Sequence, residues 1–198
     1  MDLGTSQENI SLNNHIAEVR SIWDDGNDPQ LPFKVKALLE KLLTSTSPQE
    51  PWIAKLIRDG LPATELYRDK EHGFIQMGHI HGKGHSNSPH DHGPCWVVYG
   101  AYHGAVEIAT YRRTDDGKVP GQATLEKKEV HRLTPGRALP YLPGEIHSTL
   151  ATEDSVVFRF LSYDLNQVSR NFYDSATGTV QTCLGRCYLP SKDAAMNP

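Results

Sequence analysis

Residues 84–104, GHSNSPHDHGPCWVVYGAYHG, contain two histidines one residue apart, His90 and His92. On an extended strand, residues i and i+2 point to the same face, about 6–7 Å apart along the backbone. Two imidazoles placed in this way can bind one metal ion from one side. Asp91, between them, is expected to point the other way and to support neighbouring strands.

A third ligand is expected from residues 136–147, GRALPYLPGEIH, which end in His147. In the spacing of these two stretches the chain resembles the cupin superfamily, which carries two such metal motifs. Many cupins have a ligating glutamate five residues after the second histidine, and Val97 stands there. The resemblance therefore implies three histidine ligands and no carboxylate. The residues that carry it are Gly84, His90, His92 and Gly104 in the first motif, and Gly136, Gly144 and His147 in the second.

Composition limits the class of protein. With 198 residues, 37% of them hydrophobic, the chain is long enough for one packed domain and an appendage. A net charge of −4 gives no electrostatic case for a nucleic-acid or anionic-membrane partner. No apolar run approaches the ~18 residues of a membrane helix, and the first ten residues do not resemble a signal peptide. The three cysteines do not form a disulfide-scaffold pattern. We expect a cytoplasmic protein.

The first third of the chain has helical periodicity. Apolar residues recur at helical spacing over residues 8–24 and, more strongly, over residues 33–44. Ser47 followed by a proline predicts the start of a short third helix that ends near Arg58. These helices are expected to pack as a cap on the rest of the protein. The expected division is a helical cap over residues 1–62, a barrel over residues 63–190 and a frayed tail over residues 191–198.

From Thr64 onward the hydrophobic period changes to two, which is typical of strands. Glycine- and proline-containing turns separate the short runs. The fold class predicted from this pattern is all-β, the double-stranded β-helix or jelly-roll barrel of cupins, with an N-terminal helical cap. The expected strands cover residues 64–69, 74–81, 95–100, 104–113, 123–133, 137–142, 147–152 and 155–163, with a final ribbon near 179–189.

Residues 82–92, GKGHSNSPHDH, resemble a more specific family. They match the pattern G-x-G-H-x-x-S-x-H-D-H of thiol dioxygenases of the cysteine dioxygenase family. The resemblance implies mononuclear Fe(II) held by His90, His92 and His147, and oxidation of a small thiol to a sulfinate with both atoms of O₂. Val97 replaces the cysteine that forms a thioether in the animal enzymes, and residues 157–161 lack the family's histidine and tyrosine. These departures favour a different thiol or a small organic acid over cysteine, and the expected substrate is a small anionic thiol.

The substrate contacts expected from the sequence are Arg159, His81 and Tyr163. Arg159 interrupts an apolar strand and, if it points into the barrel, is suited to bind a carboxylate with both arms of its guanidinium. In the alternative register its two phenylalanine neighbours face inward and Arg159 faces water. His81 could serve as an acid, a base or a hydrogen-bond donor. Tyr163 has the parity to point inward, whereas Tyr99 is expected to be a packing residue.

Other functions remain open from the sequence. His79 and His81 form a second His-x-His pattern, which is a rival metal site. The main site could instead hold Zn(II), Ni(II) or Mn(II) and act without redox chemistry on a small carbonyl compound. A third alternative is a non-enzymatic, ligand-binding cupin. Since cupins often pair through sheet edges, the resemblance is also compatible with a homodimer.

Overall fold

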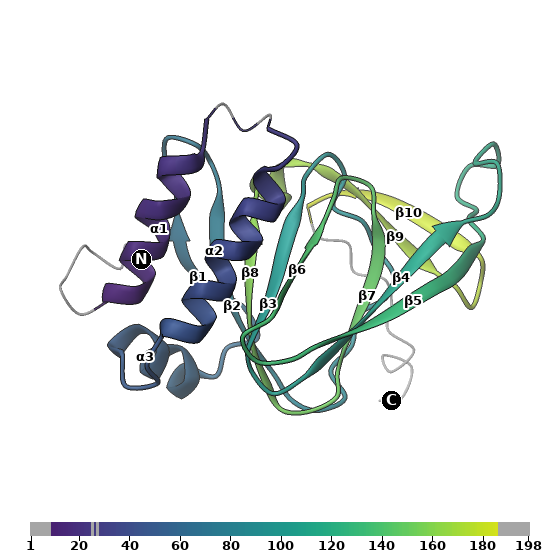
Figure 1. The fold of residues 1–198 in the computed structure, drawn as a ribbon. Coiled ribbons are helices and arrows are strands. Elements are labelled where there is room, and N and C mark those ends of the chain that lie inside the picture. The colour runs from purple at the N-terminus through teal and green to yellow at the C-terminus, as the bar shows by residue number, and fades with distance from the viewer. Residues whose placement is uncertain (1–8, 25, 27, 186–198) are drawn as a thin grey trace.

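The computed structural model describes residues 9–24, 26 and 28–185 (Figure 1). In this part of the chain the helices α1 (Ile10–Ile22), α2 (Leu31–Ser45) and α3 (Pro51–Asp59) come before the strands. A 3₁₀ turn, η1 (Leu165–Gln167), precedes the last two strands. The strands are β1 (Thr64–Arg68), β2 (Ile75–His81), β3 (Val97–His103), β4 (Val106–Arg113), β5 (Leu125–Leu133), β6 (Ala138–Tyr141), β7 (Ile146–Ala151), β8 (Ser155–Leu161), β9 (Ser169–Asp174) and β10 (Thr179–Leu184).

The strands form two walls of a barrel, and their named pairings are antiparallel. One wall has the order β1-β2-β8-β3-β6, with β8 at its centre. The other contains β5-β4-β7 and the β9-β10 ribbon, which His90 connects by bridging to both His147 and Phe172. This is a double-stranded β-helix with an N-terminal helical cap, so the predicted cupin fold class is confirmed.

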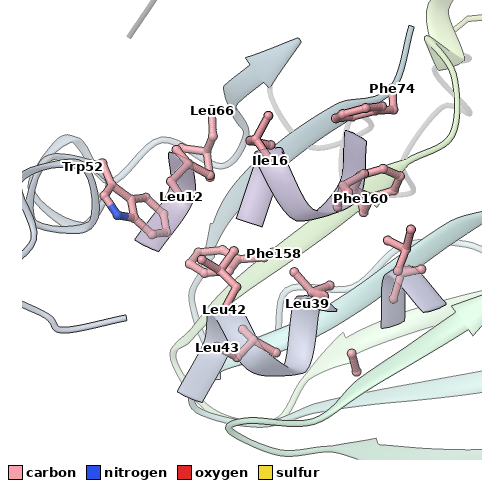
Figure 2. Packing of buried hydrophobic residues seen from close by; sticks show 14 of the residues in the cluster. Leu12, Ile16, Leu39, Leu42, Leu43, Trp52, Leu66, Phe74, Phe158 and Phe160 are labelled. Atoms are coloured by element: carbon pink, nitrogen blue, oxygen red, sulfur yellow. The ribbon is translucent and has the colours of Figure 1, made fainter. Parts of the chain in front are cut away.

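The helical cap covers the outer face of the five-stranded wall. Leu39, Leu42 and Leu43 of α2 pack with Phe158 and Phe160 of β8 (Figure 2). Two glycines permit the close approach of the helices: a Cβ atom at Gly78 would lie 2.7 Å from Leu56, and one at Gly100 would lie 2.7 Å from Leu43. The cap therefore buries the face of the sheet that would otherwise meet water.

This packing fixes the orientation of β8. Because Phe158 and Phe160 point outward into the cap, Val157, Arg159 and Leu161 must point to the opposite face. Val157 and Leu161 belong to the cluster of buried side chains inside the barrel. A strand buried on both faces reads as a nearly continuous apolar run, which explains why the sequence alone left the direction of Arg159 open.

A buried histidine of the cap should make the stability of the protein depend on pH. His15 of α1 is 3% exposed, and its burial lowers the pKa to about 4, against a smaller opposing effect of Gln76. The unfolded chain takes up this proton near pH 6.5 and the folded chain does not, so the free energy of unfolding should fall between pH 6.5 and about 4. The wild type should lose on the order of 3 kcal/mol of its free energy of unfolding over this pH range, and we expect this loss to be absent in His15→Leu. Urea unfolding at several pH values measures it. The exposed His103→Gln serves as the control, and an unchanged pH slope in His15→Leu would refute the assignment.

Not every predicted boundary agrees with the structure. Strand β8 ends at Leu161, two residues earlier than predicted, and β9 was not predicted. The expected frayed tail, residues 191–198, lies outside the described residues. No helix among the described residues is both long and apolar enough to cross a membrane.

Candidate metal centre

Three buried histidines converge beside β7. His90, His92 and His147 are 5%, 2% and 0% exposed, and each offers a ring nitrogen within 4.8 Å of those of the other two. His90 and His147 lie directly opposite each other and exchange both backbone hydrogen bonds, at 2.9 and 3.0 Å. Within the described part of the chain, no other group of three His, Cys, Asp or Glu side chains converges in this way.

Hydrogen bonds orient two of these imidazoles. The Nδ1–H of His90 donates to the Ser88 carbonyl at 2.9 Å, and the Nδ1–H of His147 donates to the Glu145 carbonyl at 3.2 Å. A neutral ring that donates from Nδ1 has its lone pair on Nε2, which is the arrangement of a metal-binding histidine. The buried Nδ1 of His92 makes no hydrogen bond among the described residues.

Burial keeps these side chains neutral. It lowers the pKa of His90 to about 4 and the pKa values of His92 and His147 well below the ordinary value. The positive charge of Arg159 lowers all three pKa values further. Since only the neutral imidazole binds a metal, the donor set fits an ion such as Fe(II), Zn(II) or Ni(II) without the loss of a proton.

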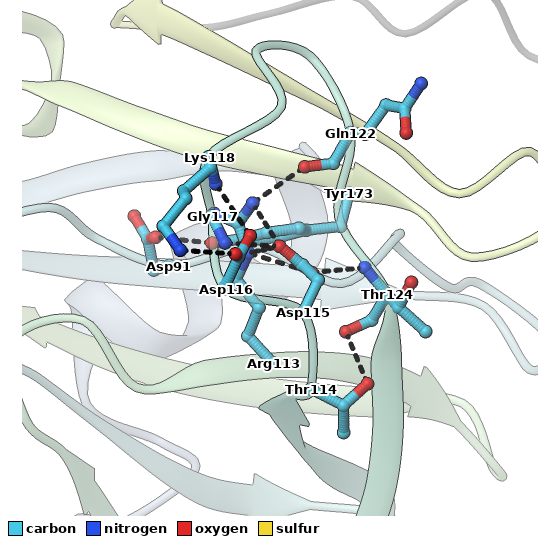
Figure 3. Close-up of polar contacts among 10 residues, drawn as sticks. All are labelled: Asp91, Arg113, Thr114, Asp115, Asp116, Gly117, Lys118, Gln122, Thr124 and Tyr173. Carbon is cyan, nitrogen blue, oxygen red and sulfur yellow. Dashed lines mark hydrogen bonds and ion pairs between the residues drawn. The ribbon is translucent and has the colours of Figure 1, made fainter.

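Asp91 holds the metal loop, residues 90–93, against β9. Its buried carboxylate accepts hydrogen bonds from the backbone N–H of Gly93 at 2.9 Å and from the backbone and side chain of Asn171 at 3.0 and 2.8 Å. Tyr173 adds a hydrogen bond from its hydroxyl at 3.3 Å (Figure 3). Burial, reinforced by the charge of Asp91, raises the pKa of Tyr173 to about 12, so the hydroxyl remains a donor. The expected supporting role of Asp91 is confirmed.

A cavity of about 520 Å³ opens beside this cluster. His90 and Tyr99 contribute to its wall, whereas His92 and His147 are buried and are not among its lining residues. Its volume suits a small organic molecule. Strands β2, β8 and β9 contribute the other side chains that matter below, which are His79, His81, Arg159, Arg170 and Phe172.

Arg159 is the polar side chain that enters the cavity from the centre of β8. Its guanidinium carbon lies 5.8 Å from the centre of the Tyr99 ring. Its Nε is buried and makes no hydrogen bond within the described chain. A buried guanidinium nitrogen without a partner is costly, and an anionic ligand in the cavity would supply the acceptor.

Three further histidines form part of the cavity wall. The rings of His81 and His85 stack at 4.3 Å, and those of His79 and His81 at 5.5 Å. Burial, aided by the charges of His85 and Arg159, lowers the pKa of His81 to about 4. His81 is therefore neutral at physiological pH and can donate or accept a hydrogen bond. The second His-x-His pattern, His79 and His81, which was the alternative metal site, is not among the convergent groups of the described residues.

The structure does not bring Tyr163 to the cavity. Its side chain is 44% exposed, and its hydroxyl donates to Oε1 of Gln167 at 3.2 Å. The predicted inward direction assumed that the strand continues through residue 163. Because β8 ends at Leu161, the alternation that places Arg159 inside the barrel no longer applies to Tyr163.

The sequence predicts that Tyr99 is a packing residue, but the structure places its hydroxyl at the histidine cluster. The oxygen lies 3.2 Å from Nε2 of His92 and 3.3 Å from Nε2 of His147. One feature of the sequence could have identified Tyr99 as a residue of the site. Tyr99 is seven residues after His92 on the same inward-facing row of β3 as Val97.

The fold and these side chains together define a cupin-type barrel with a three-histidine site that could bind a metal ion. No protein-family model matches the sequence, and no curated protein sequence matches it. Several solved structures are similar to it.

One of them is KdgF from Halomonas sp., at 21% identity and a TM-score of 0.38, with 52% of this chain and 79% of that chain covered. A cupin superfamily protein from Desulfitobacterium hafniense is 14% identical, with a TM-score of 0.38 and coverage of 52% and 76%. A protein with a double-stranded β-helix domain from Klebsiella pneumoniae is 13% identical, with a TM-score of 0.36 and coverage of 50% and 70%. Likeness at this level carries no information on activity.

Proposed function

We propose that the protein is a mononuclear non-haem iron dioxygenase that oxidises a small anionic thiol to a sulfinate with O₂. The observation that carries the proposal is the combination of three neutral histidines with Arg159 on the wall of the same cavity. The thiol dioxygenase-like motif at residues 82–92 supports this choice among metal-dependent reactions.

The reaction needs no protein nucleophile. One thiol and one O₂ give one sulfinate and one proton: two sulfur–oxygen bonds form, the O–O bond breaks, and sulfur loses the four electrons that O₂ gains. Iron, when held by His90, His92 and His147, would supply the redox chemistry that joins thiolate and O₂. The protein's task is to bind and orient the substrate beside that site.

The chain's own residues divide this task. Arg159 binds the substrate carboxylate and so fixes the end of the molecule opposite to the sulfur. Arg159 and His90 line the same cavity, so a small substrate in that cavity can meet both the guanidinium and the metal site. His81, neutral and on the wall of the same cavity as Arg159, offers a hydrogen bond to the same substrate or receives the thiol proton.

Oxygen consumption by the iron-reconstituted protein tests the proposal. The thiols are cysteine, 3-mercaptopropionate, cysteamine and mercaptosuccinate, and the sulfinate is quantified in the same samples. We expect one O₂ per thiol for at least one anionic member of the panel and little turnover of cysteamine, which has no carboxylate. Full iron occupancy without oxygen uptake for any thiol would reject the function.

Replacing Arg159 should lower kcat/KM selectively for anionic substrates. Loss of a charge-assisted, bidentate contact costs about 3 kcal/mol, so Arg159→Met should lower kcat/KM for the best anionic thiol by about 100-fold. Turnover of cysteamine should change little. The exposed Arg112→Met of β4 is the matched control. Equal losses for anionic and cationic thiols would mean that Arg159 does not bind the carboxylate.

One observation favours a second candidate, a metal-dependent enzyme without redox chemistry that acts on a small carbonyl compound. The neutral His81 on the cavity wall could take a proton from a carbon next to a carbonyl group. Zn(II), Ni(II) or Mn(II) at the three histidines would polarise that carbonyl. Turnover under strict exclusion of O₂, lost in His81→Gln, would favour this candidate over the dioxygenase.

A further inference from the structure

The hydroxyl of Tyr99 lies between two of the three metal-site histidines. Tyr99 is on β3 with its side chain inside the barrel, and it is 6% exposed. Its oxygen is 3.2 Å from Nε2 of His92 and 3.3 Å from Nε2 of His147. The same residue lines the cavity, whereas His92 and His147 are not among the lining residues. Tyr99 therefore contacts both the cavity and the histidine cluster.

These two distances fit atoms that share one metal ion. Nitrogen and oxygen ligands bind at about 2.0–2.2 Å, and the angle between neighbouring ligands is about 90–110° in octahedral and tetrahedral sites. Two such ligand atoms are then about 2.8–3.6 Å apart. Both Tyr99 distances fall in that interval, although Tyr99 is not one of the ligand positions of the two histidine motifs.

Hydrogen bonds alone explain the two contacts of the Tyr99 hydroxyl less well than a shared metal ion does. The Nδ1–H of His147 is used by the Glu145 carbonyl, so its Nε2 presents a lone pair to Tyr99. The phenol has one proton and can donate to only one ring. If the phenol donates to His147, a contact with His92 requires the proton of His92 on Nε2, the atom that has to be unprotonated when His92 binds a metal through it.

A neighbouring tyrosine shows how a packing residue differs. The ring of Tyr141 lies 4.3 Å from the ring of His147, closer than the 5.5 Å of the Tyr99 ring. Nevertheless, the buried hydroxyl of Tyr141 has no hydrogen-bond partner among the described residues. The two tyrosines thus contact the same histidine, one with its ring and the other with its oxygen.

We propose that Tyr99 is a fourth protein ligand of the metal ion, through its phenolate oxygen. The inference rests on the metal site of the proposed function. Three histidines and one phenolate leave two positions on a six-coordinate ion, one for each of the two reactants. The thiol can then contribute only its sulfur, and its carboxylate is bound by Arg159 beside the Tyr99 ring.

Absorption spectroscopy of the iron(III)-loaded protein tests the ligand directly. A phenolate bound to iron(III) gives a visible charge-transfer band that histidine ligands do not give. We expect the band in the wild type, its loss in Tyr99→Phe and its retention in Tyr141→Phe. Removal of the Tyr99 oxygen should also weaken Co(II) binding by about tenfold or more. These readouts do not depend on catalytic turnover.

The outcomes separate this inference from the proposed function. Iron bound by the wild type without the band, or a band that persists in Tyr99→Phe, overturns the role of Tyr99 while oxygen uptake still decides the dioxygenase. A wild type that binds neither iron nor Co(II) refutes both.

Thiol binding tests the prediction that the substrate binds the metal through its sulfur alone. With nitric oxide in the position of O₂, the iron(II) protein should bind cysteine no more tightly than 3-mercaptopropionate, since the amino group then finds no free position. Tyr99→Phe should shift the preference toward cysteine. A wild type that already prefers cysteine would contradict binding through sulfur alone.

Discussion

His147→Ala is expected to lose stable metal binding and, with it, all thiol-dependent oxygen uptake. Two imidazoles remain in that variant, and two ligands hold a metal ion much more weakly than three that converge on it. We expect a fall in affinity for Fe(II) or Co(II) of more than about 100-fold, since loss of a mere supporting contact already costs 10–100-fold. Titration with Co(II), followed by absorption, measures it.

Two further variants make this result interpretable. His147→Gln keeps most of the buried volume and checks that metal loss is not a consequence of the cavity left by alanine. His131→Ala removes a partly exposed histidine of β5 and should bind metal like the wild type. If His147→Ala retained wild-type affinity while folded, the three-histidine site would be wrong.

Gly93→Ala should have the largest effect on folding. Gly93 follows the second metal-site histidine with φ at +59°, and a Cβ atom there would lie 2.2 Å from the carbonyl oxygen of Ser169. Neither atom can move without separating the metal loop from β9, where Asp91 binds Asn171. We expect a loss of about 4 kcal/mol or more in the free energy of unfolding, with much weaker metal binding in any folded fraction.

Gly121→Ala is the matched control for that variant. Gly121 also has positive φ, at +75°, but a Cβ atom there would meet nothing within 4 Å. The backbone strain alone should cost about 1–2 kcal/mol. Denaturant midpoints of the two variants therefore separate the clash from the strain, and equal losses would show that the contact with Ser169 has no importance.

The sequence predicted the architecture because its signals are local and repeated. The helical spacing before Pro62, the period of two after it and the glycine-marked turns are each visible within short windows. Strand β9 was missed because Ser169–Asp174 is mostly polar, and its pairing with the metal loop depends on Asp91, 80 residues earlier along the chain. Such a contact has no signature in the strand itself.

The candidate site was predictable where spacing determines it. His90 and His92 are one residue apart, and His147 ends a second motif, so three ligands could be named from sequence. The direction of Arg159 could not be, because it depends on the cap that buries Phe158 and Phe160. Tyr163 was misplaced because β8 ends two residues early. Tyr99 was missed because an inward tyrosine on a core strand looks the same whether its oxygen packs or binds.

The most direct test of the central claim is the position of the bound metal. Crystals of the iron-reconstituted protein, measured at the iron absorption edge, give anomalous difference density for the ion alone. We predict one dominant peak within about 2.0–2.2 Å of a ring nitrogen of each of His90, His92 and His147. A peak at His79, His81 and His85 instead, or no peak in protein shown to contain iron, would contradict the account.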